Sequence, residues 1–130
     1  MTTRKIRNTL WLALIAVLIA APLSASGKSN KWRIEFSEGA KSDGEIRFVV
    51  TPAQGEPFEI VAAIADGTSE NRVARRVSEA FKTVLPKDRF HVEVDDGEDV
   101  LVKRRSGEPH FQLELVSSTV KAVRIHVEKE

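Results

Sequence analysis

Apolar and polar residues alternate in short segments after residue 30, and clusters of Gly, Pro, Asp and Ser separate these segments. The first three segments are Trp32 to Phe36, Ile46 to Val50 and Phe58 to Ile64. Because successive side chains of a strand point to opposite faces, each segment is predicted to be a strand with one buried face. The third segment also carries Val61 and Ala63 on its second face, so we expect it in the middle of a sheet.

The hydrophobic period changes from two to about 3.6 in the next segment, which lies between Ser69 and Pro86. Its apolar positions share one arc of a helix: Val73, Val77, Ala80, Phe81 and Val84. The opposite arc carries the polar positions Arg72, Arg75, Arg76 and Glu79. The pattern predicts an amphipathic helix with a hydroxyl N-cap at its start, ended by the proline.

Four more alternating segments follow the predicted helix: Phe90 to Val94, Val100 to Arg104, His110 to Leu115, and Val120 to Val127. Asp96-Gly97 and Ser106-Gly107 separate the first three of them, and such pairs tolerate the positive φ of tight hairpin turns. The predicted order of elements is therefore three strands, one helix and four strands.

The widths of these elements restrict how they assemble. Seven strands at ~4.8 Å make a flat sheet more than ~30 Å wide, whereas one helix is only ~10 Å across. The sheet must therefore curl around the helix, split into two layers, or leave an apolar face for a second copy in a homodimer. We expect an α+β domain with a curled, mainly antiparallel sheet of about seven strands packed on one amphipathic helix, in the order βββαββββ.

The N-terminal segment has the composition of a secretory signal peptide. Arg4, Lys5 and Arg7 precede an apolar run of twelve residues from Leu10 to Ala21, and Pro22 with small residues follows. A membrane span needs ~20 apolar residues, so the run favours cleavage over an uncleaved membrane anchor. The predicted organisation is a cleavable signal peptide at residues 1–25, a short polar linker at 26–30 and a single domain at 31–130.

Charge and cysteine content exclude several classes of function. The chain has a formal net charge of +1, but three of its 20 basic residues and none of its 19 acidic residues lie in the predicted signal peptide. The remainder carries 17 basic against 19 acidic residues, so it lacks the excess of positive charge that nucleic-acid binding needs. The absence of cysteine excludes disulfides, thiol catalysis and thiolate metal ligands.

The three histidines are the candidate metal ligands. The strand phasing turns His91, His110 and His126 away from the apolar face. If their strands are neighbours, the imidazoles could converge with nearby carboxylates on a zinc or copper ion. Isolated histidines in solvent are the simpler interpretation.

Two further sequence patterns resemble functional motifs but are explained without a functional site. Asp95-Asp96-Gly97-Glu98-Asp99 offers oxygen ligands for calcium, but it lacks the spacing of an EF-hand loop and favours a solvated hairpin turn. Ser118-Thr119-Val120-Lys121 matches the Ser-x-x-Lys of serine β-lactamases, yet the companion Ser-Asp-Asn and Lys-Thr-Gly motifs do not occur in the sequence. We therefore expect neither an enzyme nor a bound cofactor.

The remaining interpretation is a non-enzymatic binding domain, periplasmic or secreted, whose partner is an envelope protein or a cell-envelope polymer. An open sheet edge can accept a partner's strand, and exposed arginines can hold an acidic partner. The candidate binding residues are Trp32, Ile34 and Phe36 in the first strand, and Arg72, Arg75 and Arg76 in the helix. The last strand is the other candidate edge. The alternative is a small metal-binding or hydrolytic protein that uses His91, His110 and His126.

Overall fold

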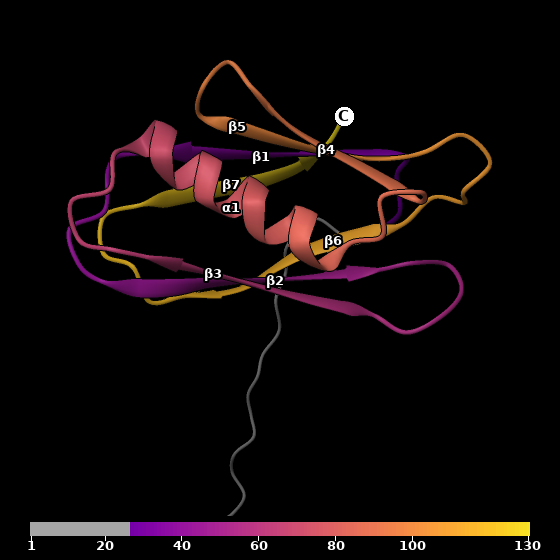
Figure 1. Ribbon diagram of the computed structural model, residues 1–130, viewed down its shortest axis with the longest axis horizontal. Coiled ribbons are helices and arrows are strands. Elements are labelled where there is room, and N and C mark those ends of the chain that lie inside the picture. Colours follow the sequence, from indigo (N-terminus) through magenta and orange to yellow (C-terminus); the bar gives the residue numbers. More distant parts are fainter. Residues whose placement is uncertain (1–26) are drawn as a thin grey trace, which may run out of the picture.

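The computed structural model describes residues 27–130, and the predicted signal peptide at residues 1–25 lies outside them. The described chain has the predicted order βββαββββ and the predicted α+β class (Figure 1). Its elements are β1 (Lys31–Ser37), β2 (Gly44–Thr51), β3 (Phe58–Ile64), α1 (Glu70–Val84), β4 (Phe90–Asp95), β5 (Asp99–Arg104), β6 (Gln112–Ser118) and β7 (Arg124–Lys129).

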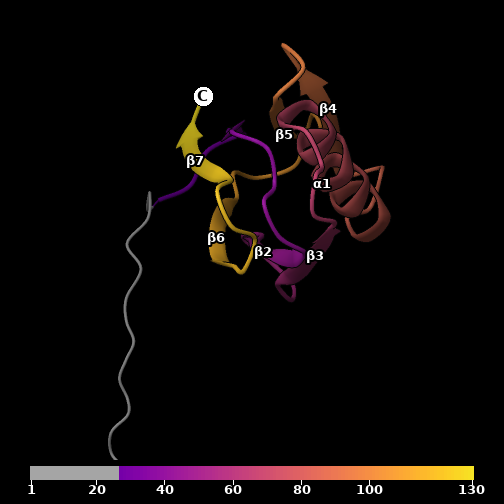
Figure 2. The same cartoon turned by 90° about the vertical axis from the view of Figure 1, so that its left-hand side faces the viewer.

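The seven strands form two antiparallel sheets that pack on the helix, so the sheet is divided rather than continuously curled. One sheet has the strand order β4-β5-β1-β7 and the other has the order β3-β2-β6. Helix α1 contacts β3 and β4, the edge strands on one side of the molecule, and Figure 2 shows β6 and β7 on the opposite side. The division arises because β6 pairs with β2 whereas β7, the next strand, pairs with β1.

The inner faces of both sheets and one face of α1 enclose a single core. Trp32 on β1 is fully buried, and its indole Nε1 donates a hydrogen bond of 3.0 Å to the carbonyl oxygen of Phe111. Phe48 on β2 packs against Phe81 of α1 with ring centroids 5.2 Å apart. These contacts join β1 to the segment before β6 and β2 to α1, so the aromatic residues connect both sheets and the helix.

Helix α1 buries the arc that its hydrophobic period predicts. Its buried residues are Val73, Ala74, Val77, Ser78 and Phe81. Ser69 is the extended N-cap residue, but its hydroxyl makes no capping hydrogen bond, unlike the predicted hydroxyl cap. The backbone N–H of Leu85 closes the last turn on the carbonyl of Phe81. The proline at position 86 then directs the chain into β4, since proline cannot continue the helix.

The prediction that the third strand lies in the middle of a sheet is wrong. β3 pairs only with β2 and is an edge strand, and the second face of β3 points to solvent with Val61 36% exposed. The strands in the middle of the larger sheet are instead β5, which pairs with β4 and β1, and β1, which pairs with β5 and β7. Apolar residues on both faces of a strand therefore did not indicate burial on both faces here.

Burial extends beyond the strand ends, and this explains the shifted boundaries of the last two strands. Phe111 precedes β6 and Val120 follows it, yet both are buried. Ser29, which we expected in a linker, exchanges two backbone hydrogen bonds of 2.9 Å with Phe111. The ordered domain therefore includes Ser29, and the turn between β6 and β7 contributes to the core.

Candidate functional site

The outer face of the β4-β5-β1-β7 sheet carries most of the paired charges. Its cross-strand register places the side chains in three rows, read from β4 towards β7. The rows are His91, Lys103 and Lys31, then Glu93, Leu101, Arg33 and Glu128, and finally Asp95, Asp99, Glu35 and His126. The first row is basic and the third is mainly acidic, so charge is segregated along the strands.

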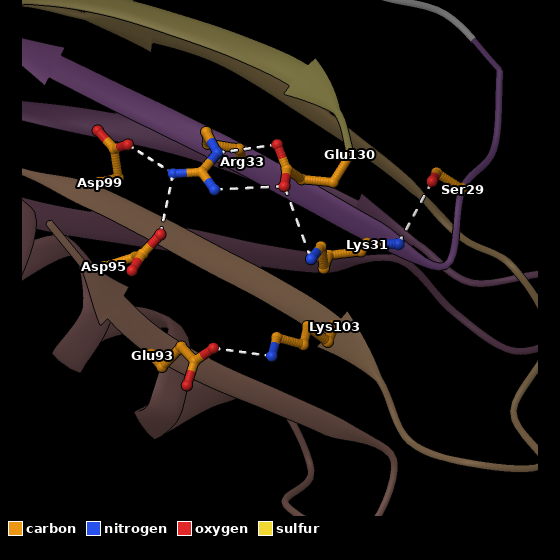
Figure 3. A network of polar contacts seen from close by, with 8 residues as sticks. All are labelled: Ser29, Lys31, Arg33, Glu93, Asp95, Asp99, Lys103 and Glu130. Atoms are coloured by element: carbon orange, nitrogen blue, oxygen red, sulfur yellow. Dashed lines mark hydrogen bonds and ion pairs between the residues drawn. The ribbon is translucent and has the colours of Figure 1, made fainter.

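Arg33 lies at the centre of this face and binds three carboxylates (Figure 3). Its Nη1 atom is 2.6 Å from Oδ2 of Asp99 and 3.2 Å from Oδ2 of Asp95. Its Nε atom donates a hydrogen bond of 2.8 Å to Oε2 of Glu130, and Nη2 donates one of 3.2 Å to Oε1. The guanidinium thereby connects the β4–β5 hairpin to the chain that follows β7.

The charges of this network are stabilised in their ionised forms. Hydrogen bonds to Glu130 and Asp99 raise the pKa of Arg33 above its already high ordinary value. Hydrogen bonding to Arg33 lowers the pKa of Glu130, and hydrogen bonding to Lys103 lowers the pKa of Glu93. The arrangement is that of a structural clamp, because every one of these groups already has a charged partner.

The clamp also covers an apolar side chain. Leu101 is only 5% exposed although it lies on the outer face, between Glu93 and Arg33 in the register. The aliphatic stems of long charged side chains can cover apolar surface in this way. The clamp therefore contributes to stability through burial as well as through charge.

The structure does not bring the three histidines together. His91 lies on β4 and His126 lies on β7, at opposite edges of the same sheet with β5 and β1 between them. Three strand spacings of ~4.8 Å separate these edges. His110 lies outside the strands, in the segment before β6, which belongs to the other sheet. A site that uses all three imidazoles has no geometric basis in this arrangement.

One histidine does lie among carboxylates. Atoms of Glu35, His126 and Glu128 that could ligate a metal ion are all within 4.8 Å of one another. Glu35 and His126 also line a groove of about 450 Å³ at the end of the sheet where Asp96 and Glu98 lie. The sequence places Glu35 and His126 on separate strands, so only the pairing of β1 with β7 could reveal this group.

The acidic segment from Asp95 to Asp99 forms the β4–β5 hairpin turn, as expected. Asp96 and Gly97 have positive φ values of 52° and 79°, which the turn requires. The carboxylates of Asp95 and Asp99 form ion pairs with Arg33. These two carboxylates therefore stabilise the hairpin and are not directed at a common calcium position.

The two sets of candidate binding residues differ in exposure. Trp32, Ile34 and Phe36 are at most 1% exposed, and their strand is paired on both sides, so the prediction of an open edge at β1 is wrong. The long-range pairing with β5 and β7 is the physical reason. The predicted last strand is an edge strand, as β7 pairs only with β1.

The helix arginines Arg72, Arg75 and Arg76 are exposed, and with Glu79 they line a hollow of about 100 Å³. Arg76 contacts Glu79 at 3.7 Å, and no other ion pair involves these arginines within residues 27–130. This surface, which we call the arginine face, is the candidate binding site that the structure leaves accessible.

No family model, no curated protein and no solved structure matches this chain. Among residues 27–130, no helix is long and apolar enough to span a membrane.

Proposed function

We propose that this protein is a non-enzymatic, extracytoplasmic binding domain whose arginine face binds an anionic polymer of the cell envelope. The observation that carries the proposal is the arginine face itself, with three exposed guanidinium groups around one hollow and a single carboxylate partner at 3.7 Å. Guanidinium groups form paired hydrogen bonds to phosphate and carboxylate, so a polymer with either group fits this surface.

The arginine face lowers the stability of the folded protein when no anion is bound. Arg72 precedes Arg75 and Arg76 by three and four residues, the spacings at which like charges on a helix repel. Arg72 also lies in the first turn of α1, where the helix dipole disfavours positive charge. A bound anion would offset both the repulsion between the arginines and the unfavourable helix dipole. Neither effect stabilises the fold.

The surroundings of the arginine face favour a polymer over a folded protein. Protein interfaces usually have an apolar core, and tight ones are anchored by buried aromatic or aliphatic residues. The exposed large apolar residues of the described chain are instead scattered over β3, α1, β4 and β6: Val61, Val84, Val94 and Val116. A flexible chain of repeated anionic groups needs no such apolar anchor.

The test uses inorganic polyphosphate and poly-L-glutamate as defined anionic polymers, with binding measured by calorimetry at low and high salt. We expect saturable binding that weakens with salt, because exposed charges are screened. The variant R72Q/R75Q/R76Q should bind about tenfold more weakly, since three exposed contacts of ~0.5 kcal/mol each amount to about one decade.

The matched control is K41Q/K121Q/K129Q, which removes the same charge from exposed lysines elsewhere on the surface. We expect this variant to bind like the wild type. Equal losses in both triple variants would show that net charge alone governs binding and would overturn the proposal. Failure of both polymers, together with arginine-dependent crosslinking to an envelope protein, would replace the polymer with a protein partner.

A further inference from the structure

We propose that Glu35, His126 and Glu128 form a binding site for a divalent transition-metal ion, of which Zn²⁺ is the representative. The site would lie on the outer face of the paired strands β1 and β7. This inference is independent of the arginine face, which belongs to α1.

The backbone fixes the three ligands relative to one another. Glu35 is directly opposite His126 in the β1–β7 register, and Glu128 follows His126 by two residues on the same face of β7. The Nε2 atom of His126 is 3.1 Å from Oε1 of Glu128. Ligand atoms about 2.0–2.2 Å from a tetrahedral zinc are roughly 3.4 Å apart, so side-chain shifts of up to ~1.5 Å would complete the site.

Glu35 carries a negative charge that the protein leaves uncompensated. On the neighbouring strand β5, Asp99 lies directly opposite Glu35, and like charges in directly opposite positions repel. The nearby guanidinium of Arg33 is directed to Asp99, Asp95 and Glu130, and no ion pair of Glu35 occurs within residues 27–130. A cation bound between Glu35 and His126 would remove this repulsion.

The groove beside the group allows a metal ion and its water ligands to enter. It has a volume of about 450 Å³, and Asp96, Glu98 and Asp99 line it together with Glu35 and His126. Arg124 lines the same groove, two residues before His126, and it forms no ion pair among the described residues. The acidic residues outnumber this one arginine, so the groove attracts cations.

The opposite edge of the sheet provides a natural comparison. His91 and Glu93 on β4 have the same spacing of two residues, with Nε2 and Oε1 3.4 Å apart. Glu93, however, also binds Lys103 at 2.8 Å, and Lys103 is the residue directly opposite His91, with Lys31 next in the same row. The pair on β4 therefore lacks a second carboxylate and has ammonium groups in its place.

The mixed ligand set indicates the class of metal. One imidazole nitrogen with carboxylate oxygens suits zinc and neighbouring first-row ions, whereas calcium takes six to eight oxygens. Three protein ligands leave at least one coordination position to water, as in the open class of zinc sites.

The experiment is a titration of the tag-free protein with ZnCl₂ near neutral pH, followed through the imidazole resonances of its three histidines by NMR. We expect the resonances of His126 to shift and saturate at one equivalent, while those of His91 and His110 stay unchanged. E35Q should bind Zn²⁺ about tenfold more weakly or worse, because one charged ligand is lost. H126N should abolish the saturable step.

H91N is the matched control and should bind Zn²⁺ like the wild type. E35Q should also unfold at the same or a higher urea concentration than the wild type without metal, since it removes the repulsion with Asp99. This readout separates loss of a ligand from loss of the fold.

Three results would overturn the proposal: unsaturable shifts of all three histidines, unchanged Zn²⁺ affinity in E35Q, or displacement of Zn²⁺ by an equal concentration of CaCl₂. R72Q/R75Q/R76Q should retain zinc binding. The metal site and the polymer-binding arginine face can therefore fail separately.

Discussion

Arg33 and Asp99 form the shortest ion pair of the four-stranded sheet, with 2.6 Å between Nη1 and Oδ2. Their side chains are 17% and 11% exposed, so the pair is largely shielded from water. The two residues lie on the neighbouring strands β1 and β5, one row apart in the register. Their contact therefore crosses the sheet diagonally and opposes sliding of one strand along the other.

Replacement of Arg33 by methionine should lower the free energy of unfolding by about 2 kcal/mol, between the values for exposed and buried ion pairs. Loss of the guanidinium leaves the mostly buried carboxylate of Asp99 without a charged partner. Urea unfolding measures the change. R47M is the control, because the ion pairs of Arg47 with Glu45 and Glu59 are more exposed, and it should change stability by less than ~0.5 kcal/mol. Equal effects would contradict a special role for Arg33.

The same network predicts a dependence of stability on acid pH. The pKa values of Glu93 and Glu130 are lowered in the folded protein, so the unfolded protein binds more protons in the acid range. Their contribution is complete above the ordinary glutamate pKa of 4.5 and is lost as the pH falls through the lower folded values. The variant E93Q/E130Q should therefore lose less stability than the wild type between about pH 5 and pH 2. Parallel pH profiles of the two proteins would show that these carboxylates are not responsible.

Trp32 tests the connection between the two sheets. The substitution W32F removes the indole N–H that binds the carbonyl of Phe111 and leaves a cavity in the core. The expected loss of stability is about 1–3 kcal/mol, from the lost indole hydrogen bond and the lost packing together, because the carbonyl of Phe111 still accepts a hydrogen bond from the backbone N–H of Ser29. Thermal unfolding followed by circular dichroism measures it, since the substitution leaves no tryptophan among residues 27–130 to report unfolding by fluorescence. A loss below ~1 kcal/mol would mean that neither the indole hydrogen bond nor the packing of the larger ring matters for stability.

Gly44 tests the close approach of β2 to the turn between β6 and β7. A Cβ atom at this position would lie 2.8 Å from the carbonyl carbon of Thr119 and 2.9 Å from its oxygen. Backbone atoms cannot turn aside as a flexible side chain can, so G44A should destabilise the protein by about 1–3 kcal/mol. Denaturant unfolding measures the change. If stability is unaffected, the β6–β7 turn is looser than the backbone hydrogen bond from Thr119 to Glu45 indicates.

The order of elements could be predicted from the sequence because it depends on local periodicity. The alternation around Ile46 to Val50 and the helical spacing from Val73 to Phe81 both lead directly to the observed elements. The buried side chains of Phe111 and Val120 continue these patterns beyond the ends of β6, so the boundaries there were displaced. Periodicity reports burial, and burial is not confined to strands.

The pairing of strands could not be predicted because it depends on contacts between distant residues. Nothing local to Trp32, Ile34 and Phe36 distinguishes a central strand from an edge strand. The same limit applies to the site, since Glu35 meets His126 only through the β1–β7 register. The exposed arginines of α1 were the exception, because helical phase alone places Arg72, Arg75 and Arg76 on the outer arc.

The position of β1 between β5 and β7 has a consequence for the order of events during synthesis. Arg33 and Glu130, which join the two ends of the domain, are 97 residues apart in the chain. Within residues 27–130, β1 therefore gains its second partner only when β7 is available, and such distant pairings form slowly. Until β7 is available, one edge of β1 therefore stays open, and a domain cut short before β7 would offer this edge to strands of other chains.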